Sequence, residues 1–260
     1  MAPPGLFHPL DPTMHFLVGT FVTIVFIDAD ASAKTLALKL PTPQELAQHF
    51  LDPGVAIGLA LFALFLYAVR DATKPLSRAQ SLAANWHLWN SVLIYTMMDG
   101  LNGAFSEHGF LSYLHKHGYQ LVDRRYHRAL VDTPAGPTAY EAAVVQTLNA
   151  TELFVYSWMS WLVAVGICKH ASWHRTLEAV VLTMAAFGAL LFVVPDYLTG
   201  CLNMQPFGEP GCMPPLTPFY FFFVYFGVVI NWIWFAVPVA MLAKTVRDDF
   251  VSAAARPKTS

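Results

Sequence analysis

Residues 143–168 read AVVQTLNATELFVYSWMSWLVAVGIC, an apolar run in which Glu152 is the single charged residue. A helix that crosses a lipid bilayer needs about 20 consecutive, mainly apolar residues. Polar and apolar side chains do not alternate in this run, so it lacks the pattern of a strand in a membrane barrel. The run therefore predicts a membrane-spanning helix.

Four further apolar runs predict helices of the same kind, at residues 54–70, 82–105, 176–198 and 219–243. The composition agrees, because 12% of the residues are charged, against about 25% in soluble domains. Residues 14–29 form a shorter candidate that crosses the membrane, re-enters it or lies at its surface. We therefore expect an all-α integral membrane protein, a transmembrane bundle of five helices, or of six if residues 14–29 also span.

The predicted spans divide the chain into three parts. These are an N-terminal segment (1–53), a transmembrane domain (54–244) and a cytosolic tail (245–260), of which we expect residues 251–260 to be disordered. Nine Lys and Arg residues fall on the side of the C-terminus and six on the other side. Positive charge favours the cytosolic side, so the C-terminus is predicted to be cytosolic and residues 106–141 and 200–218 to lie opposite.

The membrane is expected to be that of the endoplasmic reticulum. In its oxidising lumen, Cys201 and Cys212 either form a disulfide or stay as two thiols. The cysteines show neither a zinc pattern nor a CxxC pair, so no metal site is predicted. A net charge of −2 without a basic stripe argues against nucleic acid as a partner.

Asp99 and Glu152 lie deep inside predicted spans and Asp196 lies near the end of the fourth, and an ionisable residue within a span costs roughly 2.5–3.5 kcal/mol on insertion scales. Asp99 follows Tyr95 by four residues, which places both on one helix face. Glu152 follows Asn149 by nearly one turn. These groups either hold helices together through hydrogen bonds, or Asp99 stays protonated in a low-dielectric site and donates its proton to a bound lipid.

The last predicted span carries Asn231 and Trp234, three residues apart and so on neighbouring positions of one face. An indole ring stabilises a desolvated cation by on the order of 1–2 kcal/mol, which would suit a carbocation intermediate. The alternative is that Trp234 only packs against its neighbours. His87, near the start of its span, is predicted to be an interfacial histidine in preference to a proton shuttle.

The pattern Asn231-x-x-Trp234-x-x-x-Pro238, after an aromatic-rich run, resembles the emopamil-binding protein family, the membrane sterol isomerases with an EXPERA domain. The resemblance covers roughly residues 54–244. It implies that Asn231 and Trp234 are active-site residues. Residues 123–126 also look like the segment that follows the second span in that family.

Other positions depart from the family pattern. Where the family has His-x-x-x-Glu-Gly in its second span, this chain has Tyr95, Asp99 and Gly100. The catalytic Glu of the third span falls on Asn149, with Glu152 one turn later. The resemblance therefore implies chemistry through a carbocation more strongly than it implies a sterol double-bond shift.

Together these features predict an isomerase: a sterol double-bond isomerase, or a terpene cyclase started by protonation, with a sterol or other isoprenoid lipid as substrate and no cofactor. The expected roles are general acid for Asp99, relay for Tyr95, orientation for Asn231, cation stabilisation for Trp234, and help with deprotonation for Glu152 or Asn149.

Two other classes of function stay open. Loss of the family's His and aligned Glu favours a non-catalytic sterol-binding or trafficking protein. A channel or transporter is less favoured, because the polar groups are few and lie beside bulky aromatic residues. The sequence leaves the oligomeric state open, a homodimer included.

Overall fold

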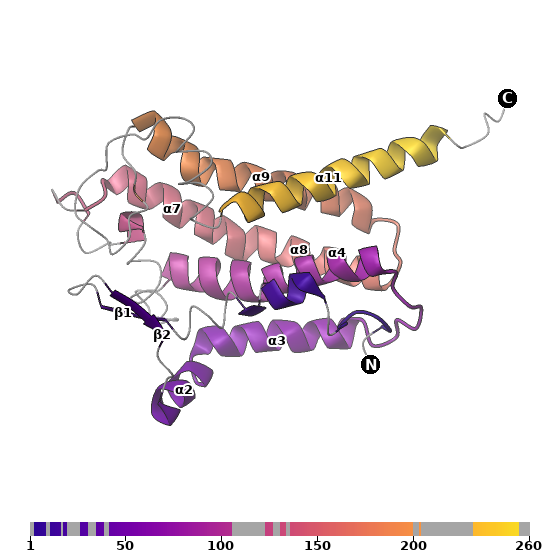
Figure 1. Cartoon of the computed structure of the whole chain (residues 1–260), viewed down its shortest axis with the longest axis horizontal. Coiled ribbons are helices and arrows are strands. Elements are labelled where there is room, and N and C mark those ends of the chain that lie inside the picture. The colour runs from indigo at the N-terminus through magenta and orange to yellow at the C-terminus, as the bar shows by residue number, and fades with distance from the viewer. Residues whose placement is uncertain are drawn as a thin grey trace.

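The chain is predominantly helical in the computed structural model, as predicted (Figure 1). The structure describes residues 3–8, 11–16, 18–19, 27–30, 35–38, 42–105, 123–126, 131–133, 136–199, 203 and 231–254. Its elements are β1 (Ile27–Asp30), β2 (Thr35–Leu38), α2 (Pro43–Phe50), α3 (Pro53–Ala68), α4 (Arg78–Trp89), η1 (Asn90–Ala104), η4 (Arg124–Tyr126), α7 (Ala139–Thr151), η6 (Glu152–Tyr156), α8 (Ser157–Cys168), α9 (His174–Thr199) and α11 (Asn231–Ala254).

Within the described residues, two helical stretches are long and apolar enough to cross a membrane, Ala139–Cys168 and His174–Phe192, and α3 is a shorter apolar helix. The first stretch joins α7, η6 and α8 end to end. Three large side chains spaced four apart on it are exposed: Phe154 at 61%, Trp158 at 49% and Leu162 at 42%. An exposed apolar stripe of this kind suits contact with lipid, so these helices support association with a membrane.

The N-terminal segment does not form the sixth helix that was predicted over residues 14–29. β1 pairs antiparallel with β2, with Ile27 opposite Leu38 and Asp30 opposite Thr35, so a continuous helix over residues 14–29 is excluded. Residues 20–26 lie outside the described residues.

Part of the predicted disorder at the C-terminus needs correction. α11 extends to Ala254, so residues 251–254 are helical, whereas residues 255–260 lie outside the described residues. One cause of the extension is the ion pair between Lys244 and Asp248, one helical turn apart, which stabilises helical structure at this position. Cys201 and Cys212 lie outside the described residues, whereas Cys168 is a buried free thiol.

The helices start where side chains cap them. Ser77 and Gln80 form a capping box at the start of α4, and Thr138 and Glu141 form another at the start of α7. In each box, two backbone N–H groups that no helical carbonyl reaches find a side-chain acceptor. α4 and η1 form one continuous helix, which packs against the continuous helix formed by α7, η6 and α8. α9 and α11 lie side by side (Figure 1).

Candidate functional site

η1 is a π-helix over residues 90–104, and η6 is a second π segment over residues 152–156. In a π-helix each N–H bonds the carbonyl five residues earlier, and such segments inside helices are often found at functional sites. The Thr96 hydroxyl follows the same spacing and donates to the Ser91 carbonyl at 2.6 Å. Both predicted carboxylates, Asp99 and Glu152, therefore lie on π segments.

The two π segments run antiparallel and in register. The Tyr95 ring meets the Tyr156 ring edge to face, with centroids 5.7 Å apart and planes at 85°. Further along, a Cβ on Gly100 would lie 2.7 Å from the Leu153 Cβ, so the backbones approach closely at that level. The Asp99 charge acts on Glu152.

Four residues thus form what we call the carboxylate cluster: Tyr95, Asp99, Glu152 and Tyr156. The charges of both carboxylates act on the Tyr95 phenol. Tyr95 is 3% exposed and Tyr156 7%, whereas Asp99 and Glu152 are half-buried. The cluster is walled by aromatic rings on one side and is more open at its carboxyl groups.

Asn149 adjoins the cluster one turn before Glu152. Its side chain is 2% exposed, packs against Gly103 and donates from Nδ2 to the Tyr126 hydroxyl at 3.1 Å. Burial, followed by the charges of Asp99 and Asp123, raises the pKa of Tyr126 well above its ordinary value. The phenol therefore stays neutral and can bond the Asn149 amide.

Tyr126 is held in place by the buried charges that precede it on η4. Arg124 Nη2 lies 2.9 Å from a Glu141 oxygen, and Arg125 Nη2 lies 2.6 Å from Asp123 Oδ2. The two arginines and Asp123 are nearly inaccessible and Glu141 is partly buried, and buried charges are stable only when paired in this way. Tyr126 is not among the predicted site residues, although the resemblance of residues 123–126 to the family's segment was a signal for it.

Trp234 lies in a different part of the molecule from the carboxylate cluster. Its Nε1 donates to Asn90 Oδ1 at 3.0 Å, and its ring packs on Trp86, with centroids 6.5 Å apart, and on Phe16, with centroids 5.8 Å apart. Asn90 starts η1, and Asp99 follows it by about two helical turns, on the order of 10 Å. A ligand that touches both Asp99 and Trp234 must extend over that distance.

Asn231 is the first residue of α11, and its side chain lies outside the described residues. The structure thus brings together Tyr95, Asp99 and Glu152, with Asn149 beside them, and leaves Trp234 apart.

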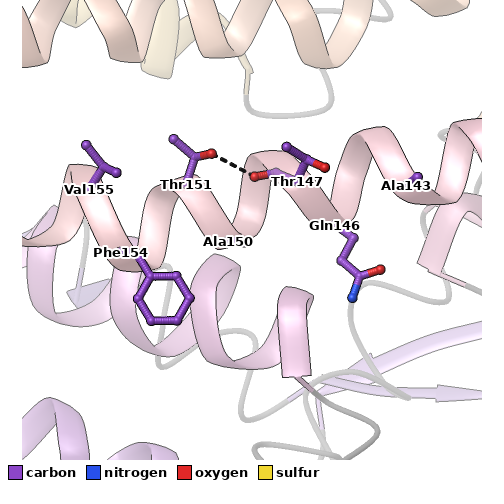
Figure 2. A pocket seen from close by; sticks show the side chains of 7 residues that line it. All are labelled: Ala143, Gln146, Thr147, Ala150, Thr151, Phe154 and Val155. Carbon is purple, nitrogen blue, oxygen red and sulfur yellow. Dashed lines mark hydrogen bonds between the residues drawn. The ribbon is translucent and has the colours of Figure 1, made fainter.

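An open groove of about 410 Å³ runs along α7 and η6. Figure 2 shows its lining, in which the Thr151 hydroxyl donates to the Thr147 carbonyl at 2.8 Å. The lining residues are Ala143, Gln146, Thr147, Ala150, Thr151, Phe154 and Val155. No predicted site residue is among them, so the groove is separate from the carboxylate cluster.

Comparison of the chain with protein-family models found no match, and comparisons with curated proteins and with solved structures found none either. The resemblance to the emopamil-binding protein family therefore depends on the residues quoted above alone.

Proposed function

We propose that the protein is a membrane-embedded isomerase or cyclase that acts on a sterol or other isoprenoid lipid by protonating an alkene or an epoxide. The observation that carries the proposal is the antiparallel packing of η1 and η6, in which Tyr95 contacts Tyr156 and Gly100 approaches Leu153, so that Asp99 and Glu152 lie at one level of the two segments. Two carboxyl groups at one level of neighbouring helices can share one proton. One group can then donate a proton while the other accepts one.

The reaction is proposed to run in three steps. The Asp99 carboxyl gives its proton to one end of the alkene or to the epoxide oxygen, which leaves a carbocation on the ligand. The Glu152 carboxylate then removes a proton from a neighbouring carbon, so that the product is an isomer of the substrate. Glu152 then releases that proton to the solvent and Asp99 takes up another from it, which restores the starting state.

The neighbouring residues have supporting roles in this proposal. Asn149, fixed by Tyr126, lies beside Glu152 and can donate a hydrogen bond to its carboxylate. Tyr95, next to Asp99 along the helix face, takes part in relaying the proton. Asn231 orients the ligand. Trp234 contacts the distant part of a ligand long enough to reach it, which sterols and polyprenyl chains are.

The proposed setting is a five-helix bundle in the membrane of the endoplasmic reticulum with a cytosolic C-terminus. Its spans would be α3, α4 with η1, α7 with η6 and α8, α9, and the last span at residues 219–243. The apolar stripe on α8 and the length of the third and fourth spans support this arrangement.

The test is turnover in deuterated water. Membranes that contain the protein are incubated with sterols that carry a ring double bond and with polyprenyl epoxides, and the lipids are analysed by mass spectrometry. From the sterols we expect an isomer that carries one carbon-bound deuterium from the solvent, whereas from the epoxides we expect an isomer whose new hydroxyl exchanges its deuterium during extraction. Asp99→Asn and Glu152→Gln should each lower the rate at least about 100-fold, as expected when a general acid or base is lost.

Asp248→Asn is the matched control, because it removes an exposed carboxylate on α11 outside the cluster. It should leave turnover unchanged. Two results would contradict the proposal: a sterol isomer without solvent deuterium, or wild-type protein that returns every bound lipid unchanged. The second result would favour the non-catalytic lipid-binding protein.

A further inference from the structure

Two connections between helices meet at one end of the bundle. Residues 69–77 connect α3 to α4, and residues 169–173 connect α8 to α9 (Figure 1). A side-chain contact joins them, because Gln80 Nε2 lies 3.4 Å from His170 Nδ1. The start of α4 is therefore held next to the end of α8, on which α4 also packs.

Exposed basic side chains surround this contact. Arg78 lies two residues before Gln80, and Lys169 lies one residue before His170, so the two cations approach each other from different helices. Further basic residues precede and follow them along the chain. The whole set, which we call the basic patch, consists of Arg70, Lys74, Arg78, Lys169 and Arg175, all of them exposed.

The basic patch contains little negative charge of its own. Asp71 is the one acidic residue in the two connections, and it lies 3.8 Å from Arg70. Within the part of the chain that the structure describes, no acidic side chain pairs with Lys74, Arg78 or Lys169. A surface with this excess of unpaired positive charge attracts anions.

Two exposed aromatic side chains indicate where the patch lies relative to a membrane. Tyr67, near the end of α3, is 64% exposed, and the Arg70 guanidinium lies 3.8 Å from the centre of its ring. Trp173, just before α9, is 48% exposed. Tyr and Trp are enriched at the ends of membrane helices, at the level of the lipid head groups. The basic patch adjoins both rings, so its cations lie at the level of the lipid phosphates.

We infer that the basic patch binds anionic phospholipids of the cytosolic leaflet, with Arg78 and Lys169 on either side of one head group. The excess of Lys and Arg predicts that this end of the bundle is cytosolic, and the cytosolic leaflet is the one rich in phosphatidylserine and phosphatidylinositol. This lipid-binding surface lies outside the carboxylate cluster and does not depend on the proposed reaction.

The experiment is a competition between two lipids. The full-length protein in neutral detergent micelles receives equal amounts of phosphatidylserine and phosphatidylcholine with the same acyl chains, and native mass spectrometry measures how much of each it retains. Arg78→Gln/Lys169→Gln is compared with the matched control Lys244→Gln/Arg247→Gln, which removes the same charge from α11, where both side chains lie near Asp248. Retention of phosphatidylcholine reports on folding.

We expect wild type and the control to retain phosphatidylserine in preference to phosphatidylcholine. In Arg78→Gln/Lys169→Gln the preference should fall at least about tenfold, because two of the cations that attract the anionic head group are gone. If that variant does not fold, Lys74→Gln/Lys169→Gln is judged by the same ratio.

Three results would overturn the inference: no preference in wild type, an unchanged preference in the variant of the patch, or an equal loss in the control. A further arm adds glycerophosphoserine, the head group without acyl chains, at the concentration of the lipids. It should leave the preference in place. If it abolished the preference, the patch would bind a soluble anion and not a membrane lipid, and the inference would be wrong.

Discussion

His87 is the residue whose environment differs most from its prediction. Its position near the start of a predicted span indicated an interfacial histidine, yet the side chain is 1% exposed and its Nε2 lies 3.5 Å from Glu178 Oε1. Glu178 belongs to α9 and is itself buried. The pair links α4 to a helix far along the chain, which no local pattern could predict.

Removing one member of this pair should be costly. His87→Leu leaves the Glu178 carboxyl buried without its neighbour, and loss of the partner of a buried polar group lowers the free energy of unfolding by about 1–3 kcal/mol. Unfolding of the purified protein in detergent micelles measures the loss. The double variant His87→Leu/Glu178→Leu should recover most of it, and a double variant as unstable as the single one would show that the two side chains are not coupled.

Part of the carboxylate cluster could be predicted from individual residues of the sequence. Tyr95, Asp99, Asn149 and Glu152 were identified because each is polar inside an apolar run, and the structure places them near one another. Tyr156 was missed because a tyrosine in such a run is not exceptional. Tyr156 belongs to the cluster because its ring contacts the Tyr95 ring from another helix, and a single sequence does not show that contact.

The elements that matter most to the site are the two π segments. The helices could be predicted from length and composition, and α3 at Pro53–Ala68 and α9 at His174–Thr199 begin and end within a few residues of their predictions. The π geometry could not, because α- and π-helices share residue preferences and differ in how the chain packs on its neighbours. The strands β1 and β2 were missed because residues 14–29 are apolar enough to suggest a single helix.

Close contact between η1 and α7 depends on Gly103. A Cβ at this position would lie 1.9 Å from Asn149 Nδ2, so Gly103→Ala forces Asn149 to move and breaks its hydrogen bond to Tyr126. Overpacking of a buried contact costs about 1–3 kcal/mol, and unfolding in detergent should show a loss of that size. If Asn149 assists Glu152, turnover should fall as well.

Gly19→Ala provides the control, since none of the residues that the structure describes lies within 4 Å of a Cβ at Gly19. It should leave both stability and turnover unchanged. Equal losses in the two variants would mean that the contact between Gly103 and Asn149 is not what holds these helices together.

At the scale of the whole molecule, the helices share one packing scheme. α8 lies between α4 and α9, and α9 packs in turn on α11. Buried side chains of α3, α4, η1 and α8 form the core, whereas Phe154, Trp158 and Leu162 face outward. A protein that buries polar pairs such as His87–Glu178 and exposes large apolar side chains has the distribution expected when lipid is the surrounding solvent.

The topology of the proposed bundle can be tested with glycosylation acceptors. One acceptor is inserted after Thr133, between η4 and α7, and another is appended after Ser260. Three predicted spans separate the two sites, so they should lie on opposite sides of the membrane. Because nine Lys and Arg residues lie on the side of the C-terminus and six on the other, the site after Thr133 should be the lumenal one.

We therefore expect the acceptor after Thr133 to be glycosylated and the one after Ser260 to stay unmodified, with endoglycosidase treatment as the control for the shift in mobility. If only the acceptor after Ser260 is glycosylated, the orientation is the opposite of the predicted one, but the number of crossings between the two sites is still odd. Equal modification of both sites would mean an even number, which would remove at least one of the last three predicted spans. At least one of the segments 139–168, 174–199 and 219–243 would then not cross the membrane, and the five-helix bundle would be wrong.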